Sequence, residues 1–196
     1  MFNENDIDQA MNHINQSVQH LSQTIDDFKD FIKKNKVKEN FLLENTFNKT
    51  FQLITAQFKN ANIIIEKSIQ NIALYGMQRE LIQVFINILN NARDELVKQN
   101  ISLKFISIDA ITQNDKIEIT ILDNAGGISP EHTDKIFESH FTTKQDDKGT
   151  GIGLYMSKMI IEESWNGTIQ VYNKYFTYNN QPFTGAEFKI TLPLKD

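Results

Sequence analysis

Three polar side chains recur along a segment whose other side is apolar. Asn87, Asn91 and Asp94 are spaced four and three residues apart, which places them on one stripe of a helix. Carboxamide oxygens that point from such a stripe into a cavity are hard ligands suited to Mg²⁺ with most of its waters retained. Asparagine on a helix is more often simply hydrated, so the stripe indicates a metal site only together with other features.

A second group of residues follows an apolar segment directly. Residues 123–128 read Asp-Asn-Ala-Gly-Gly-Ile. A carboxylate at the end of a strand is held rigidly, and Asp123 can accept a hydrogen bond from an exocyclic amino group such as that of adenine. Gly126 and Gly127 let the backbone turn sharply or approach a flat ring. A simple turn explains the same residues, so both interpretations remain open from this segment alone.

A third group, residues 149–154, reads Gly-Thr-Gly-Ile-Gly-Leu and leads into a helical segment. The free N–H groups at a helix N-terminus form an anion site where glycines remove steric cover. Such glycine patterns often mislead when they stand alone. The order of the three groups is more informative, because a long polar segment separates the last two.

The elements that position these groups follow from hydrophobic periodicity. The apolar side of residues 78–99 carries Leu81, Phe85, Ile88, Leu89, Ala92 and Leu96. The other predicted elements are a short strand beginning at Leu42, helices over 46–59 and 152–164, strands over 62–66, 102–111, 116–122, 168–173 and 185–194, and a loop over 124–149 with one helical turn near 135–138.

The N-terminal segment carries an unbroken heptad seam. Its apolar positions are Ile7, Met11, Ile14, Val18, Leu21, Ile25, Phe28 and Ile32. Burial of each such side chain stabilises by about 1.5–3 kcal/mol, so a long helix with this seam favours pairing. The partner is another helix of the same protein or the same helix of a second chain; folding back onto its own domain is the alternative. A polar stretch at 35–40 marks a domain boundary.

Composition excludes several classes of function. The 196 residues contain 20 Lys and Arg against 25 Asp and Glu, which gives a net charge of −5 and argues against a nucleic-acid partner. The absence of cysteine excludes disulfides, thiol catalysis and zinc–thiolate sites. No apolar run approaches the ~18 residues that a membrane span needs. We therefore expect a cytoplasmic chain that makes no membrane contact of its own.

The ordered motifs resemble the ATP-binding catalytic domain of sensor histidine kinases, within the wider gyrase, chaperone and mismatch-repair ATPase superfamily. The resemblance covers about residues 39–196. Residues 87–92 resemble the N box, and residues 123–128 the first glycine box, with Ala125 where many members have glycine. Residues 136–144 resemble the F box, residues 149–154 the second glycine box, and residues 184–186 a late Thr-Gly segment.

The resemblance implies a Bergerat-type fold, an α+β two-layer sandwich in which helices cover one face of a mixed sheet, preceded by one long helix. It implies that ATP and Mg²⁺ bind, with Asn91 as the principal metal ligand and Asn87 nearby. Asp123 would bind the adenine amino group, and Lys144, in a lid at about 124–150, would reach the phosphates. The residues expected at the nucleotide are Asn87, Asn91, Asp94, Asp123, Ala125, Gly127, Ile128, Phe137, Thr143, Lys144, Gly149, Thr150, Gly151, Ile152, Gly153, Leu154 and Thr184.

Two departures from the family pattern bear on the phosphate end. Ser139 and His140 stand where relatives usually have proline and an aromatic residue, and Asp94 stands where many kinases have a basic residue. A phosphate contact at position 94 is thereby lost, and Arg93 is expected to point about 100° away on an ideal helix.

The resemblance favours phosphoryl transfer over hydrolysis. The hydrolysing branch commonly has glutamate where this chain has Asn87, and a carboxamide cannot take up the proton of an attacking water at neutral pH. We therefore expect ATP-dependent protein histidine kinase activity. The alternatives are a nucleotide-binding regulatory module without phosphotransfer and, ranked lower, a serine/threonine kinase of the anti-sigma-factor type.

The heptad segment resembles the second helix of the family's dimerisation and phosphotransfer hairpin, which assigns residues 1–38 to it and residues 39–196 to the ATP-binding domain. The resemblance implies a homodimer through this helix, a phosphoacceptor helix and a response regulator as partners. Neither His13 nor His20 is followed by the acceptor motif. We therefore expect the acceptor histidine to lie on a helix outside this chain, which is either a fragment or a natural protein that lost it. The resemblance leaves open whether the parent protein is membrane-anchored.

Overall fold

The computed structural model describes Met11, residues 37–144 and residues 150–194. Apart from Met11, the predicted heptad helix lies outside the described residues, as do His13, His20 and Gly149. Within the described part of the chain, no helix is both long and apolar enough to cross a bilayer.

The architecture is built on a five-stranded mixed sheet with the strand order β2-β4-β5-β7-β6. Its strands are β2 (Ile63–Ile69), β4 (Lys104–Gln113), β5 (Lys116–Asp123), β6 (Thr168–Tyr178) and β7 (Gln181–Pro193). The strands β2 and β4 pair in parallel, and every other pairing in this sheet is antiparallel. Alternating apolar residues on β5 and β7 give the sheet one buried face.

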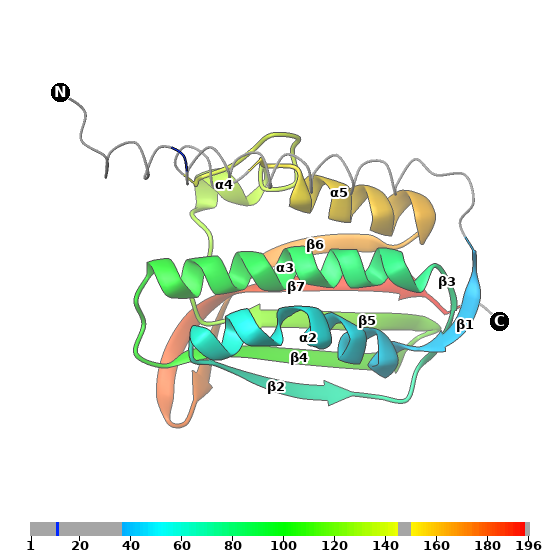
Figure 1. Cartoon of the computed structure of the whole chain (residues 1–196), viewed down its shortest axis with the longest axis horizontal. Helices are drawn as coiled ribbons and strands as arrows, with labels where there is room; N and C mark the ends of the chain where they lie inside the picture. The colour runs from blue at the N-terminus through cyan, green and yellow to red at the C-terminus, as the bar shows by residue number, and fades with distance from the viewer. Residues whose placement is uncertain (1–10, 12–36, 145–149, 195–196) are drawn as a thin grey trace.

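Helices cover that buried face (Figure 1). They are α2 (Leu43–Asn60), α3 (Gln78–Lys98) and α5 (Gly153–Met159), and α5 continues into η1 (Ile160–Ser164). A small antiparallel sheet of β1 (Glu39–Leu42) and β3 (Ala73–Gly76) and the short helix α4 (Pro130–Thr133) complete the fold. The predicted two-layer α+β class is confirmed.

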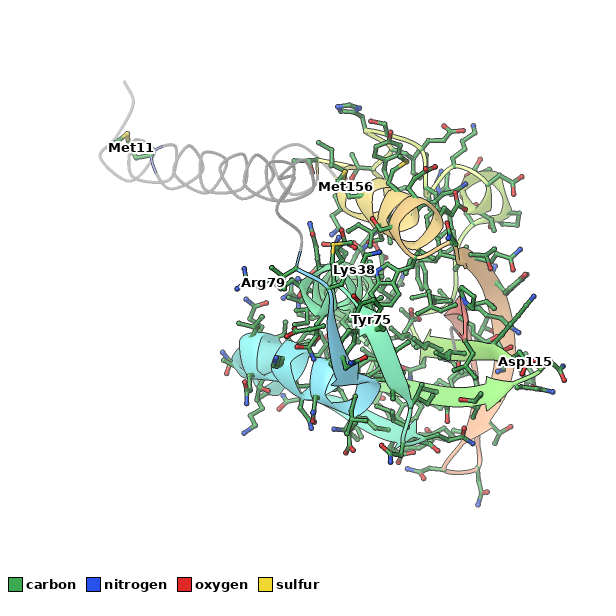
Figure 2. The ribbon with its side chains drawn as sticks, turned by 90° about the vertical axis from the view of Figure 1, so that its right-hand side faces the viewer. Met11, Lys38, Tyr75, Arg79, Asp115 and Met156 are labelled. Atoms are coloured by element: carbon green, nitrogen blue, oxygen red, sulfur yellow. The ribbon has the colours of Figure 1, made fainter. Side chains whose placement is uncertain are left out.

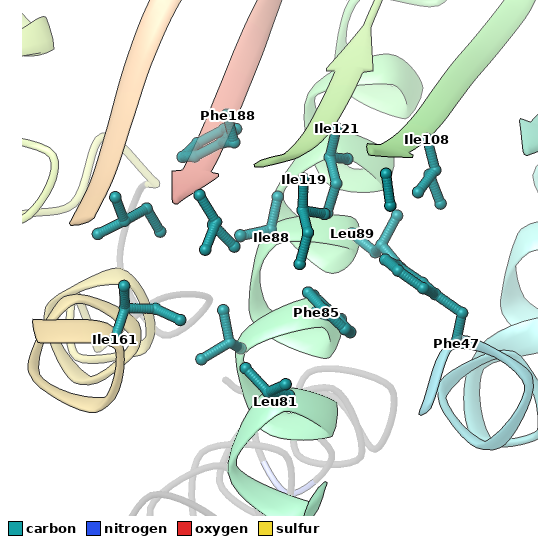
Figure 3. Close-up of a cluster of buried hydrophobic side chains, with 14 of the residues drawn as sticks. Phe47, Leu81, Phe85, Ile88, Leu89, Ile108, Ile119, Ile121, Ile161 and Phe188 are labelled. Atoms are coloured by element: carbon teal, nitrogen blue, oxygen red, sulfur yellow. The ribbon is translucent and has the colours of Figure 1, made fainter. Parts of the chain in front are cut away.

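The core lies between α3 and the centre of the sheet (Figure 3). All six apolar residues predicted for one side of α3 are buried, each with at most 3% of its surface exposed. Phe85 of α3 stacks on Phe47 of α2, with ring centroids 4.2 Å apart. On the sheet, Ile119 and Ile121 are fully or almost fully buried and face α3. Packing on this side leaves the opposite stripe of α3, with its asparagines, free to line a groove.

Two hairpins turn on residues with positive φ. In the β4–β5 turn, Asn114 and Asp115 have φ of 51° and 56°, and in the β6–β7 turn Asn179 and Asn180 have φ of 49° and 61°. A two-residue type I′ turn needs positive φ at both positions, and Asn and Asp tolerate it best after glycine. Figure 2 shows Asp115 at the outer end of its hairpin.

Several predicted element bounds are wrong. The strand predicted to begin at Leu42 ends there, and α2 begins at Leu43. A hydrogen-bonded turn is present near 135–138, where the Glu138 N–H donates to the Lys135 carbonyl at 2.8 Å. The helix α4 at Pro130–Thr133 was not predicted; proline fixes φ for its first position, and the Ser129 carbonyl accepts from the N–H groups of His132 and Thr133. The strands β6 and β7 extend beyond their predicted ranges into one long hairpin, and β3 was not predicted.

The helix predicted over 152–164 is present, but its last turn is π-helical. The Trp165 N–H bonds the Ile160 carbonyl at 3.3 Å, a spacing of five residues. Trp165 then packs over Gly76, where an added Cβ would lie 2.5 Å from its ring. This contact ties the end of η1 to β3.

Candidate functional site

One groove collects most of the predicted site residues. The polar stripe of α3, the end of β5, the segments 127–129 and 141–144 and the start of α5 all line it. Fourteen of the seventeen predicted residues contribute to its wall: Asn87, Asn91, Asp94, Asp123, Ala125, Gly127, Ile128, Thr143, Lys144, Thr150, Gly151, Ile152, Gly153 and Leu154. The helices α3 and α5 thus lie together although β4, β5 and α4 separate them along the chain.

The three remaining predicted residues do not line the described groove. Gly149 lies outside the described residues. Phe137 instead packs edge-on against Phe188, with centroids 6.3 Å apart, and lies beneath the Lys158 ammonium. Thr184 acts through its backbone, because its carbonyl accepts a 2.9 Å hydrogen bond from the Gly126 N–H.

Asn87 joins α3 to the start of α5. Its Nδ2 donates to the Gly153 carbonyl at 3.0 Å and to the Ser157 hydroxyl at 3.1 Å. Both donor positions of the carboxamide are therefore used within the protein, which fixes the direction of its Oδ1. An added Cβ on Gly153 would lie 3.5 Å from the Asn87 side chain, so the two helices approach closely here.

Asp94 accepts from two cations at the other end of the stripe. Its Oδ2 lies 2.6 Å from the Lys144 ammonium, and its Oδ1 lies 2.6 Å from Arg93 Nη2. The Lys144 ammonium also lies 3.5 Å from the Oδ1 of Asn91. Lys144 is thus held against α3 by a partly buried ion pair.

The position of Arg93 differs from the expectation that it points away from Asp94. Its long side chain folds back along the helix, and Nη1 also donates to Asn90 Oδ1 at 3.0 Å. The same guanidinium contacts Gln57 and lies 6.0 Å from the centre of the Phe58 ring. Arg93 therefore links the polar stripe to α2, which the direction of its Cα–Cβ bond alone does not reveal.

Asp123 is a carboxylate buried at the end of β5, with 4% of its surface exposed. Its Oδ1 accepts from the Ala125 N–H at 2.8 Å and from the Ala186 N–H at 3.2 Å. Burial raises the pKa of Asp123 from 3.8 to about 6, although both N–H groups oppose the rise. Among the described residues Oδ2 has no hydrogen-bond donor, so it remains available to a ligand's amino group.

The neighbouring Asn124 has a structural task. Its Oδ1 accepts from the Phe105 N–H and its Nδ2 donates to the Leu103 carbonyl, both at 2.8 Å. The side chain thereby replaces strand pairing at the start of β4, and it fixes the direction in which the chain leaves β5.

A residue that sequence reasoning missed is Asn173 of β6. Its side chain bonds both the N–H and the carbonyl of Ile128, each at 2.7 Å. The signal that could have found it is the alternation of buried and exposed residues along β6. Asn173 is the next residue on the side of the strand on which Ile169 and Val171 are buried. A polar residue in that series indicates a partner at the edge of the sheet.

Gly151, in the second glycine segment, packs against His140. Gly151 has φ of +65°, and an added Cβ there would lie 2.3 Å from the carbonyl carbon of His140. The His140 N–H donates to the Gly151 carbonyl at 3.2 Å. The first hydrogen bond of the following helix joins Met156 N–H to the Ile152 carbonyl, so the N–H groups that precede Met156 are not used by the helix.

Comparison with known proteins identifies relatives of one kind. Residues 76–196 match the family described as histidine kinase-, DNA gyrase B- and HSP90-like ATPase. The two-component sensor PprA of Pseudomonas aeruginosa is 33% identical over 64% of this chain and 13% of its own length. Sporulation kinase A of Bacillus subtilis is 31% identical over 83% of this chain and 25% of its own length. The chain therefore spans a quarter or less of these relatives.

Solved structures with a similar fold are also histidine kinases. The structure of histidine kinase ThkA in complex with response regulator protein TrrA superposes with a TM-score of 0.71 at 20% identity, and the match covers 100% of this chain and 53% of that one. At this identity the likeness speaks for the fold alone. Since the family match covers more than half of the chain, the chain belongs to the histidine kinase-, DNA gyrase B- and HSP90-like ATPase family.

Proposed function

We propose that this chain binds Mg·ATP in the groove and donates the γ-phosphoryl group to a histidine on a helix outside the chain. The observation that carries the proposal is the convergence of a buried carboxylate, an asparagine stripe and a glycine-rich helix start on one groove. The names of the relatives, which are sensor and sporulation kinases, support this activity over hydrolysis.

The adenine end lies at Asp123. An amino group donates and a carboxylate accepts, so Oδ2 suits the exocyclic amine of adenine. Gly127 and Ile128 line the groove beside it. The backbone at Gly127 lies close to Asn173, where an added Cβ would be 2.6 Å from its Oδ1, so a residue with a side chain does not fit at this position of the turn.

The phosphate end lies between α3, Lys144 and the start of α5. Mg²⁺ would neutralise charge on the phosphates and hold their geometry. The residue suited to hold it is Asn91, which lines the groove and whose Oδ1 is a hard ligand. Asn87 supports this end through its bonds to Gly153 and Ser157. The unused N–H groups of residues 153–155 would face the phosphate oxygens.

Transfer is favoured over hydrolysis because no general base stands at position 87, where the hydrolysing branch of the family commonly has glutamate. Asn87 occupies that position, and its amide group already donates twice within the protein. Positioning and charge neutralisation then carry the reaction, with the acceptor nitrogen supplied by another helix.

The partners and organisation belong to the same proposal. We assign residues 39–196 to the ATP-binding domain and residues 1–38 to a helix that forms a homodimer. ThkA, which has the same fold, was solved with a response regulator, and we propose a response regulator as the downstream partner here as well. We propose that the chain acts in the cytoplasm, where ATP is available.

The proposal is tested with γ-labelled ATP and Mg²⁺. The chain should bind ATP, remain unlabelled by itself, and label an added acceptor-helix protein with the acid lability and base stability of phosphohistidine. Label on His13 or His20 would contradict the assignment of the acceptor to another helix. ATP binding without label on any added acceptor would favour the regulatory module.

Replacing Asn91 tests the metal assignment. Asn91→Ala removes the proposed Mg²⁺ ligand, and we expect ATP affinity in Mg²⁺ to fall by about tenfold while affinity in a chelator is unchanged. Calorimetry with and without Mg²⁺ measures both values. Asn60→Ala, at the exposed last residue of α2 and outside the groove, is the control. Normal Mg²⁺-dependent binding by Asn91→Ala would rule out this ligand.

Replacing Asp94 tests whether its ion pair competes with the phosphates for Lys144. In Asp94→Asn the lid ammonium loses its 2.6 Å partner, so it is free to contact a phosphate. We expect ATP to bind about three- to tenfold tighter and the free energy of unfolding to fall by about 1 kcal/mol. Titration at low and high salt measures the effect, since screening weakens it. Asp109→Asn, an equal charge change at an exposed site on β4, should leave affinity unchanged; weaker binding by Asp94→Asn would contradict the competition.

A further inference from the structure

We propose that Asn173 is a positioning residue that fixes the end of the Asp123–Ile128 turn against β6 and so shapes the adenine side of the groove. The inference rests on the proposed nucleotide binding. It concerns a residue on a strand that carries none of the sequence motifs.

The contact between Asn173 and Ile128 has two points. Oδ1 accepts from the Ile128 N–H and Nδ2 donates to the Ile128 carbonyl, each at 2.7 Å. A carboxamide that satisfies both backbone groups of one residue imitates strand pairing, and it leaves that residue little freedom to rotate. Gly127 meets the same side chain so closely that a Cβ would lie 2.6 Å from Asn173 Oδ1.

This contact completes a series that joins the turn to the sheet. The Ala186 N–H donates to Asp123 Oδ1, and the Gly126 N–H donates to the Thr184 carbonyl at 2.9 Å. Asn173 is the register partner of Ala186 on the neighbouring strand. The first two attachments use backbone groups of β7, whereas the third depends on a side chain, so it is removable by one substitution.

The strand that carries Asn173 is itself held firmly. Beyond it, the β6–β7 hairpin reaches β2, where the Tyr178 hydroxyl donates to Glu66 Oε1 at 2.9 Å. The Tyr178 ring stacks on Phe105 of β4 with centroids 3.8 Å apart. The end of the hairpin is thereby held by β2 and β4, and pairing of Asn173 with Ala186 holds the strand at the turn itself.

Loss of the anchor should act on binding more than on folding. Asn173 is exposed, and its removal opens no cavity in the core. The residues that it orients, Gly127 and Ile128, line the groove beside Asp123. A turn that is free to move must be ordered by the nucleotide, which lowers affinity.

The test compares Asn173→Ala with Gln170→Ala in the same chain. Gln170 is an exposed carboxamide on the same strand, so the control also removes a carboxamide, but away from the turn. The affinity for ADP is measured by calorimetry, the midpoint of urea unfolding by circular dichroism, and the exchange of the Ile128 amide proton by NMR.

We expect Asn173→Ala to bind ADP about tenfold more weakly, to exchange the Ile128 amide faster, and to keep the urea midpoint of wild type and of Gln170→Ala. Unchanged affinity with faster amide exchange would overturn the inference, because the hydrogen bonds between Asn173 and Ile128 would then hold the turn without affecting nucleotide binding. A lower midpoint that accompanies the weaker binding would also overturn it, because the role would be structural. Failure of the wild-type chain to bind ADP would instead contradict the proposed function on which the inference rests.

Discussion

Asp123→Asn is expected to weaken ATP binding by about 100-fold, or about 2.7 kcal/mol, while the chain remains folded. The reason lies in the two backbone N–H groups of Ala125 and Ala186, which both donate to Oδ1. In the asparagine variant these donors require the carboxamide oxygen at the Oδ1 position. The NH₂ group then occupies the Oδ2 position and faces the adenine amino group, donor against donor, and an unmade hydrogen bond of this kind is costly.

The same substitution is expected to stabilise the chain without ligand. The pKa of Asp123 is about 6 in the folded state against 3.8 ordinarily, so the unfolded chain releases its proton first as the pH rises. The contribution of this group to stability is therefore present below pH 4 and lost as the pH rises through about 6. At pH 7 the buried charge costs about 3 kcal/mol. Asp123→Asn, which has no charge to bury, should be more stable than wild type at pH 7 and lose that advantage near pH 4.

Calorimetry with ATP and urea unfolding at pH 4 and pH 7 measure both effects. Asp115→Asn is the matched control, because it removes the same charge at an exposed β4–β5 turn (Figure 2) where asparagine tolerates the positive φ. Wild-type ATP affinity in Asp123→Asn would contradict the adenine assignment. A variant that is both unstable and unable to bind would show that Asp123 serves the fold instead.

The sequence predicted those parts of the site that depend on local periodicity. The stripe Asn87, Asn91 and Asp94 lies opposite the buried side of α3 because a helix places residues three and four apart together. The fold class was implied by the family that the ordered motifs resemble. The roles assigned to these residues at the nucleotide remain predictions.

Contacts that depend on tertiary approach were not predictable. Arg93 returns to Asp94 because Gln57 and Phe58 of α2 lie beside it, and nothing in the helix geometry of α3 reveals α2. The strand β3 is only four residues long, and its pairing with β1 decides its conformation. Asn173 meets Ile128 across 45 residues of sequence, a distance over which periodicity carries no information.

Gly185→Ala should unfold the chain or reduce its stability by about 4 kcal/mol or more, which is a large share of the 5–15 kcal/mol typical of a domain. An added Cβ at Gly185 would lie 1.6 Å from the Asp123 carbonyl oxygen. Neither backbone is free to move, because Asp123 of β5 pairs with Ile106 of β4 and Gly185 of β7 pairs with Lys174 of β6. Urea unfolding and the yield of folded chain measure the effect.

Gly153→Ala is the control, since its Cβ would make an ordinary contact of 3.5 Å with the Asn87 side chain and alanine favours a helix. It should keep the urea midpoint of wild type.

A stable Gly185→Ala chain would mean that β5 and β7 can separate at Asp123. The close approach at Gly185 is what lets the chain leave β5 directly beside β7, so that the Ala186 N–H reaches Asp123. Separation of the strands would break that bond, so a stable Gly185→Ala chain should still lose ATP affinity, and one that kept both stability and affinity would refute this account of how Asp123 is positioned.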